Sequence, residues 1–176
     1  MLGVDPGTLV TGYGLIRRDA AGLRLLDAGT VRNRPGTPMP ERLLAIHTVL
    51  RRLIETHRPA SCAVESAFYG KNAQSALKLG HARGVALLAA AERSIPTAEY
   101  SPREVKKAVA GNGGARKEQV RTMVQTLLGI PRSTMALDTS DALAVALCHI
   151  HRGGTAAPAR RTWKAFVEAH PERIAR

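Results

Sequence analysis

Leu2-Gly-Val-Asp-Pro-Gly-Thr8 is a short apolar run that ends in an acid and is followed at once by a turn. The apolar residues predict a buried strand from Leu2 to Asp5, and Pro6 and Gly7 force the chain to turn directly after it. Open α/β sheets place their functional sites at strand ends, so Asp5 is a candidate site residue. Taken alone, the segment from Asp5 to Gly12 fits either a metal-binding strand end or a loop that cradles phosphate.

After this stretch, two further strand-like segments are followed by alternating helices and strands. The further strands are predicted at residues 11–18, 23–31, 59–65 and 95–100. The helices are predicted at residues 41–56, 73–93, 103–110, 116–128 and 138–151. Three early strands followed by this alternation predict an α/β fold with a mixed five-stranded sheet flanked by helices. The first strand is short, since only four residues precede Asp5, and we expect it to be weakened.

The charge of the chain indicates a polyanionic partner. Its 176 residues suit one domain, and 26 Lys and Arg against 14 Asp and Glu leave a net charge of +12. Nucleic acid is the first candidate for such a partner and an anionic membrane surface the second. No apolar run approaches the ~20 residues of a membrane span, and the start does not resemble a signal peptide. We therefore expect a cytoplasmic protein without a membrane segment.

Composition also indicates the limits of the domain and the state of its cysteines. Residues 1–152 are predicted to form the domain, and 153–176 a basic tail that is loosely attached or partly helical. Cys62 and Cys148 lie in apolar stretches, which indicates buried, reduced thiols rather than a disulfide or a zinc site. Aromatic residues are scarce, so nucleic-acid recognition should depend on phosphate contacts and shape, with one or two aromatic wedges at most.

Four carboxylates from three separate segments are candidates for one shared site. Asp5 and Glu65 end predicted strands, while Asp138 and Asp141 lie three residues apart at a helix start and share one face. Hard oxygen ligands of this kind suit Mg²⁺ or Mn²⁺. Two such ions can activate a water and stabilise the leaving oxygen of a phosphodiester. Plainer interpretations stay open: Asp5 as the cap of its turn, Glu65 as an ordinary strand-end charge, and Asp138 as a helix N-cap.

Longer segments resemble the bacterial RuvC resolvase family, in the family's order and spacing over about residues 1–152. The most specific of them is the block K-N-x-x-S-A-L-K-L-G-x-A-R-G, which starts at Lys71. The segments that carry the resemblance are Leu2–Thr8, Val64-Glu65, Lys71–Gly80 with Ala82-Arg-Gly84, Tyr100-Ser101 with Val105-Lys106, and Asp138–Leu147.

This resemblance implies an RNase H-like fold, a homodimer, and paired symmetric nicks across a Holliday (four-way) junction in DNA recombination and repair. It assigns metal binding and catalysis to Asp5, Glu65, Asp138 and Asp141. It further implies Mg²⁺ as the cofactor, with Mn²⁺ as a substitute and two ions per active site. The RuvA–RuvB branch-migration complex is the partner that the resemblance implies.

The resemblance also suggests DNA contacts. Phe68 aligns with the aromatic residue that the family uses near the junction centre, where a ring could stack on an unpaired base, and Tyr69 could share that role. Lys106 and Lys117 align with basic positions near the family's active site, where a lysine could steady the scissile phosphate. Further contacts with DNA are expected from Lys71, Asn72, Ser75, Lys78, Lys107 and Arg116.

Two glycines on the long helix have two interpretations. Gly80 and Gly84 are four residues apart and permit another element to approach closely. That element could be a second copy of the chain at a dimer seam, or the sheet of the same chain.

Two other functions compete with a junction-cleaving nuclease. An actin-like ATPase or sugar kinase uses a similar D-x-G-T loop, but it needs two such domains and roughly twice this length. A junction-binding protein without catalysis is the second rival. Four acids facing phosphates argue against it, because a pure DNA binder gains nothing from them.

Overall fold

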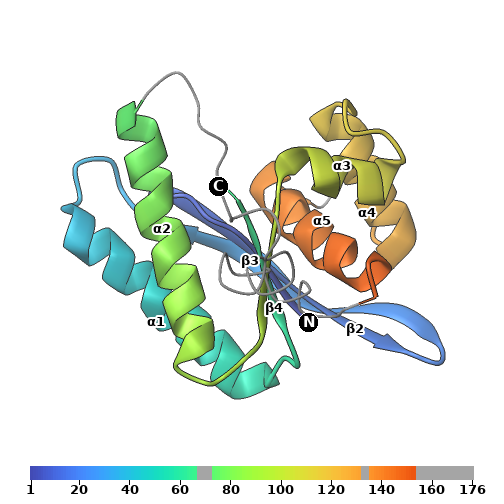
Figure 1. The fold of residues 1–176 in the computed structure, drawn as a ribbon, viewed down its shortest axis with the longest axis horizontal. Helices are drawn as coiled ribbons and strands as arrows, with labels where there is room; N and C mark the ends of the chain where they lie inside the picture. The colour runs from blue at the N-terminus through green and yellow to red at the C-terminus, as the bar shows by residue number, and fades with distance from the viewer. Residues whose placement is uncertain (67–72, 132–134, 154–176) are drawn as a thin grey trace, which may run out of the picture.

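A mixed sheet with helices on both faces forms the body of the computed structural model, which describes residues 1–66, 73–131 and 135–153 (Figure 1). The five strands follow the order β3-β2-β1-β4-β5. They are β1 (Leu2–Asp5), β2 (Val10–Asp19), β3 (Gly22–Arg32), β4 (Cys62–Glu65) and β5 (Thr97–Tyr100). The first three strands are antiparallel neighbours, and β4 and β5 run parallel to β1. The predicted mixed five-stranded sheet is confirmed.

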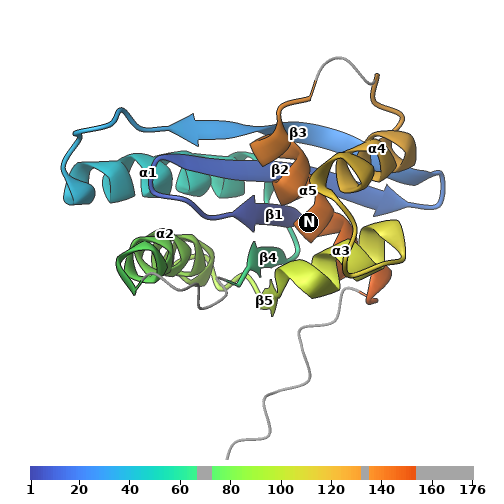
Figure 2. The same cartoon turned by 90° about the horizontal axis from the view of Figure 1, so that it is seen from above.

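The helices divide into two groups that lie on opposite faces of this sheet (Figure 2). One group is α1 (Met39–His57) and α2 (Ala73–Ala91), and the other is α3 (Pro102–Ala110), α4 (Lys117–Leu128) and α5 (Leu137–His151). No described helix combines the length and the apolar character that crossing a membrane requires.

The start of α3 shows how local sequence sets a helix boundary. The Ser101 hydroxyl accepts a hydrogen bond from the Glu104 backbone N–H, and the Glu104 carboxylate accepts one from the Ser101 N–H at 2.9 Å. This reciprocal capping box satisfies two otherwise unpaired donors, and Pro102 fits the first helical position because its ring presets φ. The helix predicted at residues 103–110 is therefore confirmed, and it begins one residue earlier, at Pro102.

The short first strand is held from both sides, contrary to the expectation that it would be weakened. Leu2 and Val4 are buried at 1% and 0% exposure. β1 pairs with β2 on one side and with β4 on the other. The Met1 amino group and the Ile16 N–H also donate to each other's carbonyl oxygens, at 3.1 and 3.0 Å. The strand lies at the centre of the sheet, and this position compensates for its length.

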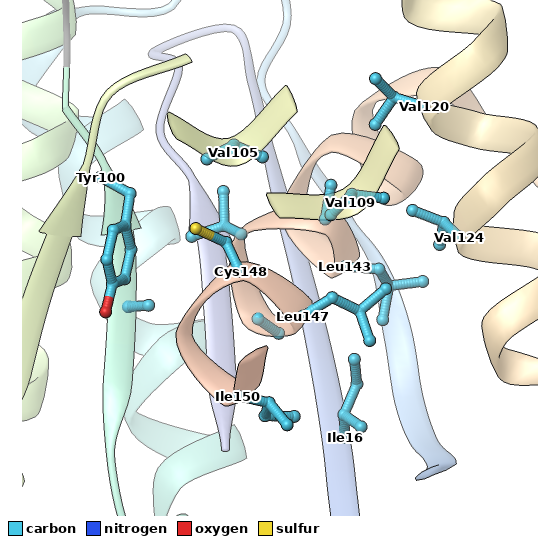
Figure 3. Packing of buried hydrophobic residues seen from close by; sticks show 14 of the residues in the cluster. Ile16, Tyr100, Val105, Val109, Val120, Val124, Leu143, Leu147, Cys148 and Ile150 are labelled. Atoms are coloured by element: carbon cyan, nitrogen blue, oxygen red, sulfur yellow. The ribbon is translucent and has the colours of Figure 1, made fainter. Parts of the chain in front are cut away.

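Each face of the sheet carries its own apolar core. On the α1–α2 side, Ile46 and Leu50 pack over Leu2, Val4 and Val64. On the other side, α5 lies between the sheet and the helices α3 and α4, as Figure 3 shows. Every residue of α5 from Ala142 to Ile150 is buried, which is expected of a helix that is apolar all round. Cys62 and Cys148 are free and buried, as predicted.

Two glycines allow α5 to lie directly on the strands. A Cβ atom at Gly3 of β1 would overlap the carbonyl oxygen of Ala142, and one at Gly12 of β2 would overlap the carbonyl oxygen of Asp138. Gly12 is also the cross-strand partner of Asp5. Backbone contact at Gly12 therefore brings the first turn of α5 next to the end of β1.

Replacing Gly12 by Ala should separate these two backbones. Because the added methyl would overlap a backbone atom that cannot rotate away, we expect Gly12→Ala to lower the free energy of unfolding by about 1–3 kcal/mol or more. Chemical denaturation followed by circular dichroism measures this. Gly114→Ala is the matched control, since a Cβ there meets nothing closer than 3.5 Å. Equal stability of the two variants would contradict the close packing of α5 on β2.

Candidate active site

Two of the four candidate acids meet because their strands are parallel neighbours. Asp5 ends β1 and Glu65 ends β4, and the register pairs Val4 with Val64 one residue earlier. Their carboxyl groups share a hydrogen bond. The strand ends therefore place two acids side by side at one edge of the sheet.

The other two acids come from the first turns of α5. Asp138 and Asp141 lie one turn apart on α5, and both act electrostatically on Asp5. The N-cap of this helix is Ala136, so the interpretation of Asp138 as the N-cap is wrong. The backbone contact at Gly12 fixes the distance of this turn from the strands.

A pocket of about 340 Å³ opens where these elements meet. Asp5, Glu65 and Asp141 line it, while Asp138 does not. The other lining residues come from the loops after β1 and β4 and from α2, α3, α4 and α5: Pro6, Ser66, Leu79, Pro102, Val105, Lys106, Lys117, Val120 and Ala144. The structure thus brings three of the four predicted acids and two of the predicted lysines into one pocket.

Burial raises the pKa of both strand-end acids. Desolvation is the main cause, and the negative charges of neighbouring carboxylates add to it. The pKa of Asp5 rises to about 6 and that of Glu65 to about 8. Because each carboxyl group affects the pKa of the other, the two acids titrate as a pair.

Lys117 supplies positive charge to the same pocket. Its ammonium group donates to the Asp141 carboxylate over 3.2 Å. The negative charge of Asp141 raises the pKa of Lys117, so the lysine stays protonated at neutral pH. Lys106 lines the pocket from α3. The pocket therefore pairs acids on the sheet and α5 with bases on α3 and α4.

The donor set fits a hard divalent cation, although the side chains do not form a closed cage around one point. Among the described residues, no three Asp, Glu, His or Cys side chains are grouped closely enough to hold a metal ion as they stand. The chemistry of the pocket is nevertheless that of a cation site, because buried carboxylate oxygens with raised pKa values are what Mg²⁺ and Mn²⁺ neutralise. The raised pKa values of Asp5 and Glu65 show that the fold disfavours uncompensated negative charge at this position.

The other predicted DNA contacts fall into two groups. Lys107 and Arg116 are exposed and lie outside the pocket, and Ser75 and Lys78 are exposed on the first turns of α2, which also brings Leu79 to the pocket. The remaining four predicted contacts lie outside the described residues: Phe68, Tyr69, Lys71 and Asn72.

Two residues that hold the loop after Asp5, Thr11 and Asn33, were not predicted from the sequence. Thr11 is fully buried, and its hydroxyl donates to the Gly7 carbonyl at 2.6 Å. The Asn33 side-chain amide donates to the carbonyls of Thr8 at 2.9 Å and Arg42 at 3.3 Å. The only sequence signal for Thr11 is a polar residue six positions after the candidate acid Asp5, and nothing in the sequence links Asn33 to this loop.

Known proteins are similar to this chain in both sequence and fold. The family model described as crossover junction endodeoxyribonuclease RuvC matches residues 1–149. The chain belongs to the RuvC family. A RuvC protein of Chloroherpeton thalassium is 52% identical over 147 residues, which cover 84% of this chain and 79% of that protein. A RuvC protein of Salinibacter ruber is 45% identical over 175 residues, covering 99% and 98%.

A solved structure supports the same assignment. The structure of T. thermophilus RuvC in complex with Holliday junction substrate matches with a TM-score of 0.82 at 38% identity, covering 89% of this chain and 97% of that chain. The family membership makes this chain a metal-dependent endodeoxyribonuclease with an RNase H-like fold, as the sequence predicted. The ATPase or sugar kinase alternative is thereby excluded.

The raised pKa values predict how stability depends on pH in metal-free protein. An acid whose pKa is higher in the folded state stabilises the fold at low pH, and this contribution is lost as pH rises through the folded-state pKa. For Asp5 and Glu65 we therefore expect the melting temperature in EDTA to fall as pH rises from about 5 to about 8.

Asp5→Asn should flatten this dependence and raise the melting temperature at pH 8, since it removes one of the two repelling charges. Asp19→Asn, at an exposed hairpin turn, is the control. Calorimetric melts across the pH range provide the measurement, and a wild-type melting temperature that rises up to pH 8 would contradict the burial of the pair.

Proposed function

We propose that this chain resolves four-way DNA junctions by paired symmetric nicks, with Asp5, Glu65, Asp138 and Asp141 as the ligands of its metal ions. The observation that carries the proposal is the meeting of the two strand-end acids, the α5 acid Asp141 and two lysines at one pocket. The acids suit the binding of metal ions and the lysines suit the binding of a phosphate. The pocket therefore has both kinds of charged group that metal-dependent hydrolysis of a phosphodiester needs.

Mg²⁺ is the proposed cofactor, with Mn²⁺ as a substitute and two ions per site. Bound there, the ions would activate a water and stabilise the leaving oxygen of the phosphodiester. Asp5 and Glu65 are proposed as the central ligands because burial raises the pKa of both and a hydrogen bond joins them. Asp141 lines the same pocket, and Asp138 would complete the set from one helical turn away.

Lys117 and Lys106 are proposed to hold the scissile phosphate. Lys117 stays protonated beside Asp141, and its side chain is 64% exposed, so its charge remains accessible to DNA. A fixed positive charge next to the reacting phosphate stabilises the extra negative charge of the transition state. Lys107, Arg116, Ser75 and Lys78 are proposed to contact the backbone further from the cut. Phe68 and Tyr69 are proposed to act near the junction centre, and Lys71 and Asn72 to contact backbone phosphates.

The exposed face of α2 supports the proposed homodimer. Leu77 and Leu88 are 65% and 54% exposed, although both are large and apolar. Between them, a Cβ at Gly80 or Gly84 would meet nothing within 4 Å, so these glycines do not pack against the sheet of their own chain. The interpretation that Gly80 and Gly84 pack on the sheet is wrong, and we propose instead that they lie at a dimer seam. Two protomers joined along this stripe would each cut one strand of the junction.

The RuvA–RuvB branch-migration complex remains a proposed partner and the cytoplasm the proposed compartment. Both follow from the family and from the need to act where recombining DNA is.

Replacing the central acid should abolish cutting while sparing binding. We expect Asp5→Asn to slow Mg²⁺-dependent cleavage of a synthetic four-way junction by more than roughly 100-fold, because even partners of metal ligands cost about 10–100-fold. Mobility shifts should show junction affinity that is unchanged or higher, because a negative charge facing phosphate is lost. Asp19→Asn is the matched control and should cut at the wild-type rate.

Nick mapping completes this experiment. The wild type should produce two nicks at symmetric positions on opposing strands. An Asp5→Asn variant that cuts normally would show that the metal assignment is incorrect, and a wild type that binds but never cuts would favour the non-catalytic rival.

A charge on the α2 stripe should separate the protomers. We expect Leu77→Glu to convert dimers to monomers in light-scattering chromatography and to replace paired nicks by single nicks. Leu44→Glu is a close control, since Leu44 on α1 is also 65% exposed but lies outside the stripe. A Leu77→Glu protein that remains dimeric would place the dimer seam elsewhere.

A further inference from the structure

Arg32 stands at the edge of the proposed metal site. It is the last residue of β3, and its Cα pairs in register with Val10, the first residue of β2. One guanidinium nitrogen lies 3.8 Å from a carboxylate oxygen of Asp138. Neither the family resemblance nor the pocket lining had pointed to this residue.

Each candidate metal ligand has a partner that offsets its charge or shares its proton. Asp5 and Glu65 share a hydrogen bond, Asp141 accepts one from Lys117, and the ion pair of Asp138 is with Arg32. Asp138 differs from the other three acids because it does not line the pocket. Its partner lies on the β3 side, whereas Lys106 and Lys117 reach the pocket from α3 and α4.

We propose that Arg32 exchanges partners during loading of the site: it holds Asp138 in the metal-free protein and binds a DNA phosphate once Asp138 binds metal. This inference rests on the proposed function, because it requires Asp138 to be a metal ligand. Arg32 is thereby a positioning residue for Asp138 and a phosphate contact on β3, outside the pocket that the two lysines line.

The geometry of the pair suits such an exchange. At 3.8 Å, with side chains that are 62% and 43% exposed, the two groups are loosely associated, and an exposed ion pair of this kind is worth little. A divalent ion on Asp138 removes the attraction that holds Arg32. The freed guanidinium keeps a planar fork of donors that matches the oxygens of a phosphate.

The exchange predicts two effects of opposite sign from one substitution. In the absence of DNA, Arg32→Gln should tighten Mn²⁺ binding by up to about fivefold, because the competing cation at Asp138 is gone. Titration of free Mn²⁺ by electron paramagnetic resonance measures this without any cleavage. Arg34→Gln is the matched control, since it removes the same charge two residues away and should change Mn²⁺ affinity less.

The second effect concerns DNA. With Ca²⁺ bound and the junction verified as intact, Arg32→Gln should weaken junction binding and reduce the slope of log affinity against log salt by about one, the value of one phosphate contact. In EDTA the loss should be smaller, because Arg32 is then engaged with Asp138. Arg32→Lys should restore part of the affinity, since it keeps the charge but not the fork.

The outcomes separate this inference from the proposed function. A wild type that binds no Mn²⁺ would overturn both. A wild type that binds Mn²⁺, with Arg32→Gln and Arg34→Gln shifted equally, would overturn only the pairing of Arg32 with Asp138. An unchanged salt slope for Arg32→Gln in Ca²⁺ would overturn the exchange to phosphate.

Discussion

The direct backbone contact between α5 and the strands β1 and β2 is the constraint on which the site depends. Gly12 faces the carbonyl oxygen of Asp138 and pairs across the sheet with Asp5, so the absence of a side chain at Gly12 lets the helical acid approach the strand-end acid. Gly3 likewise allows the backbone of α5 to approach the sheet, at Ala142 further along the helix. A side chain at either position would move α5 away from the sheet, and Asp138 and Asp141 would move with it.

The same arrangement concentrates negative charge at a cost to the fold. Burial and mutual repulsion raise the pKa values of Asp5 and Glu65, so the metal-free protein is less stable at neutral pH than its apolar packing allows. Lys117 beside Asp141 and Arg32 beside Asp138 offset part of the repulsion. Burial of apolar side chains in the two cores, including most of α5, compensates for this loss of stability.

Local patterns predicted the elements, and the strand-end rule predicted half of the site. The start of α3 was predicted to within one residue because Ser101 followed by Pro102 is a local helix-start signal. Asp5 and Glu65 were readable because each ends an apolar run. The contact of Gly12 with Asp138 could not be predicted, because a glycine in a strand indicates a close approach but not which element approaches. The pairing of Arg32 with Asp138 could not be predicted either, because the two residues are far apart in the sequence and no local pattern links them.

If β1, β4 and α5 assemble one metal site, anomalous diffraction from a crystal soaked in Mn²⁺ should locate the metal there. We expect density bonded to carboxylate oxygens of Asp5 and Glu65 and of at least one of the α5 acids, Asp138 or Asp141. Density that avoids Asp5, or that is held by the strand acids without any contribution from α5, would contradict it.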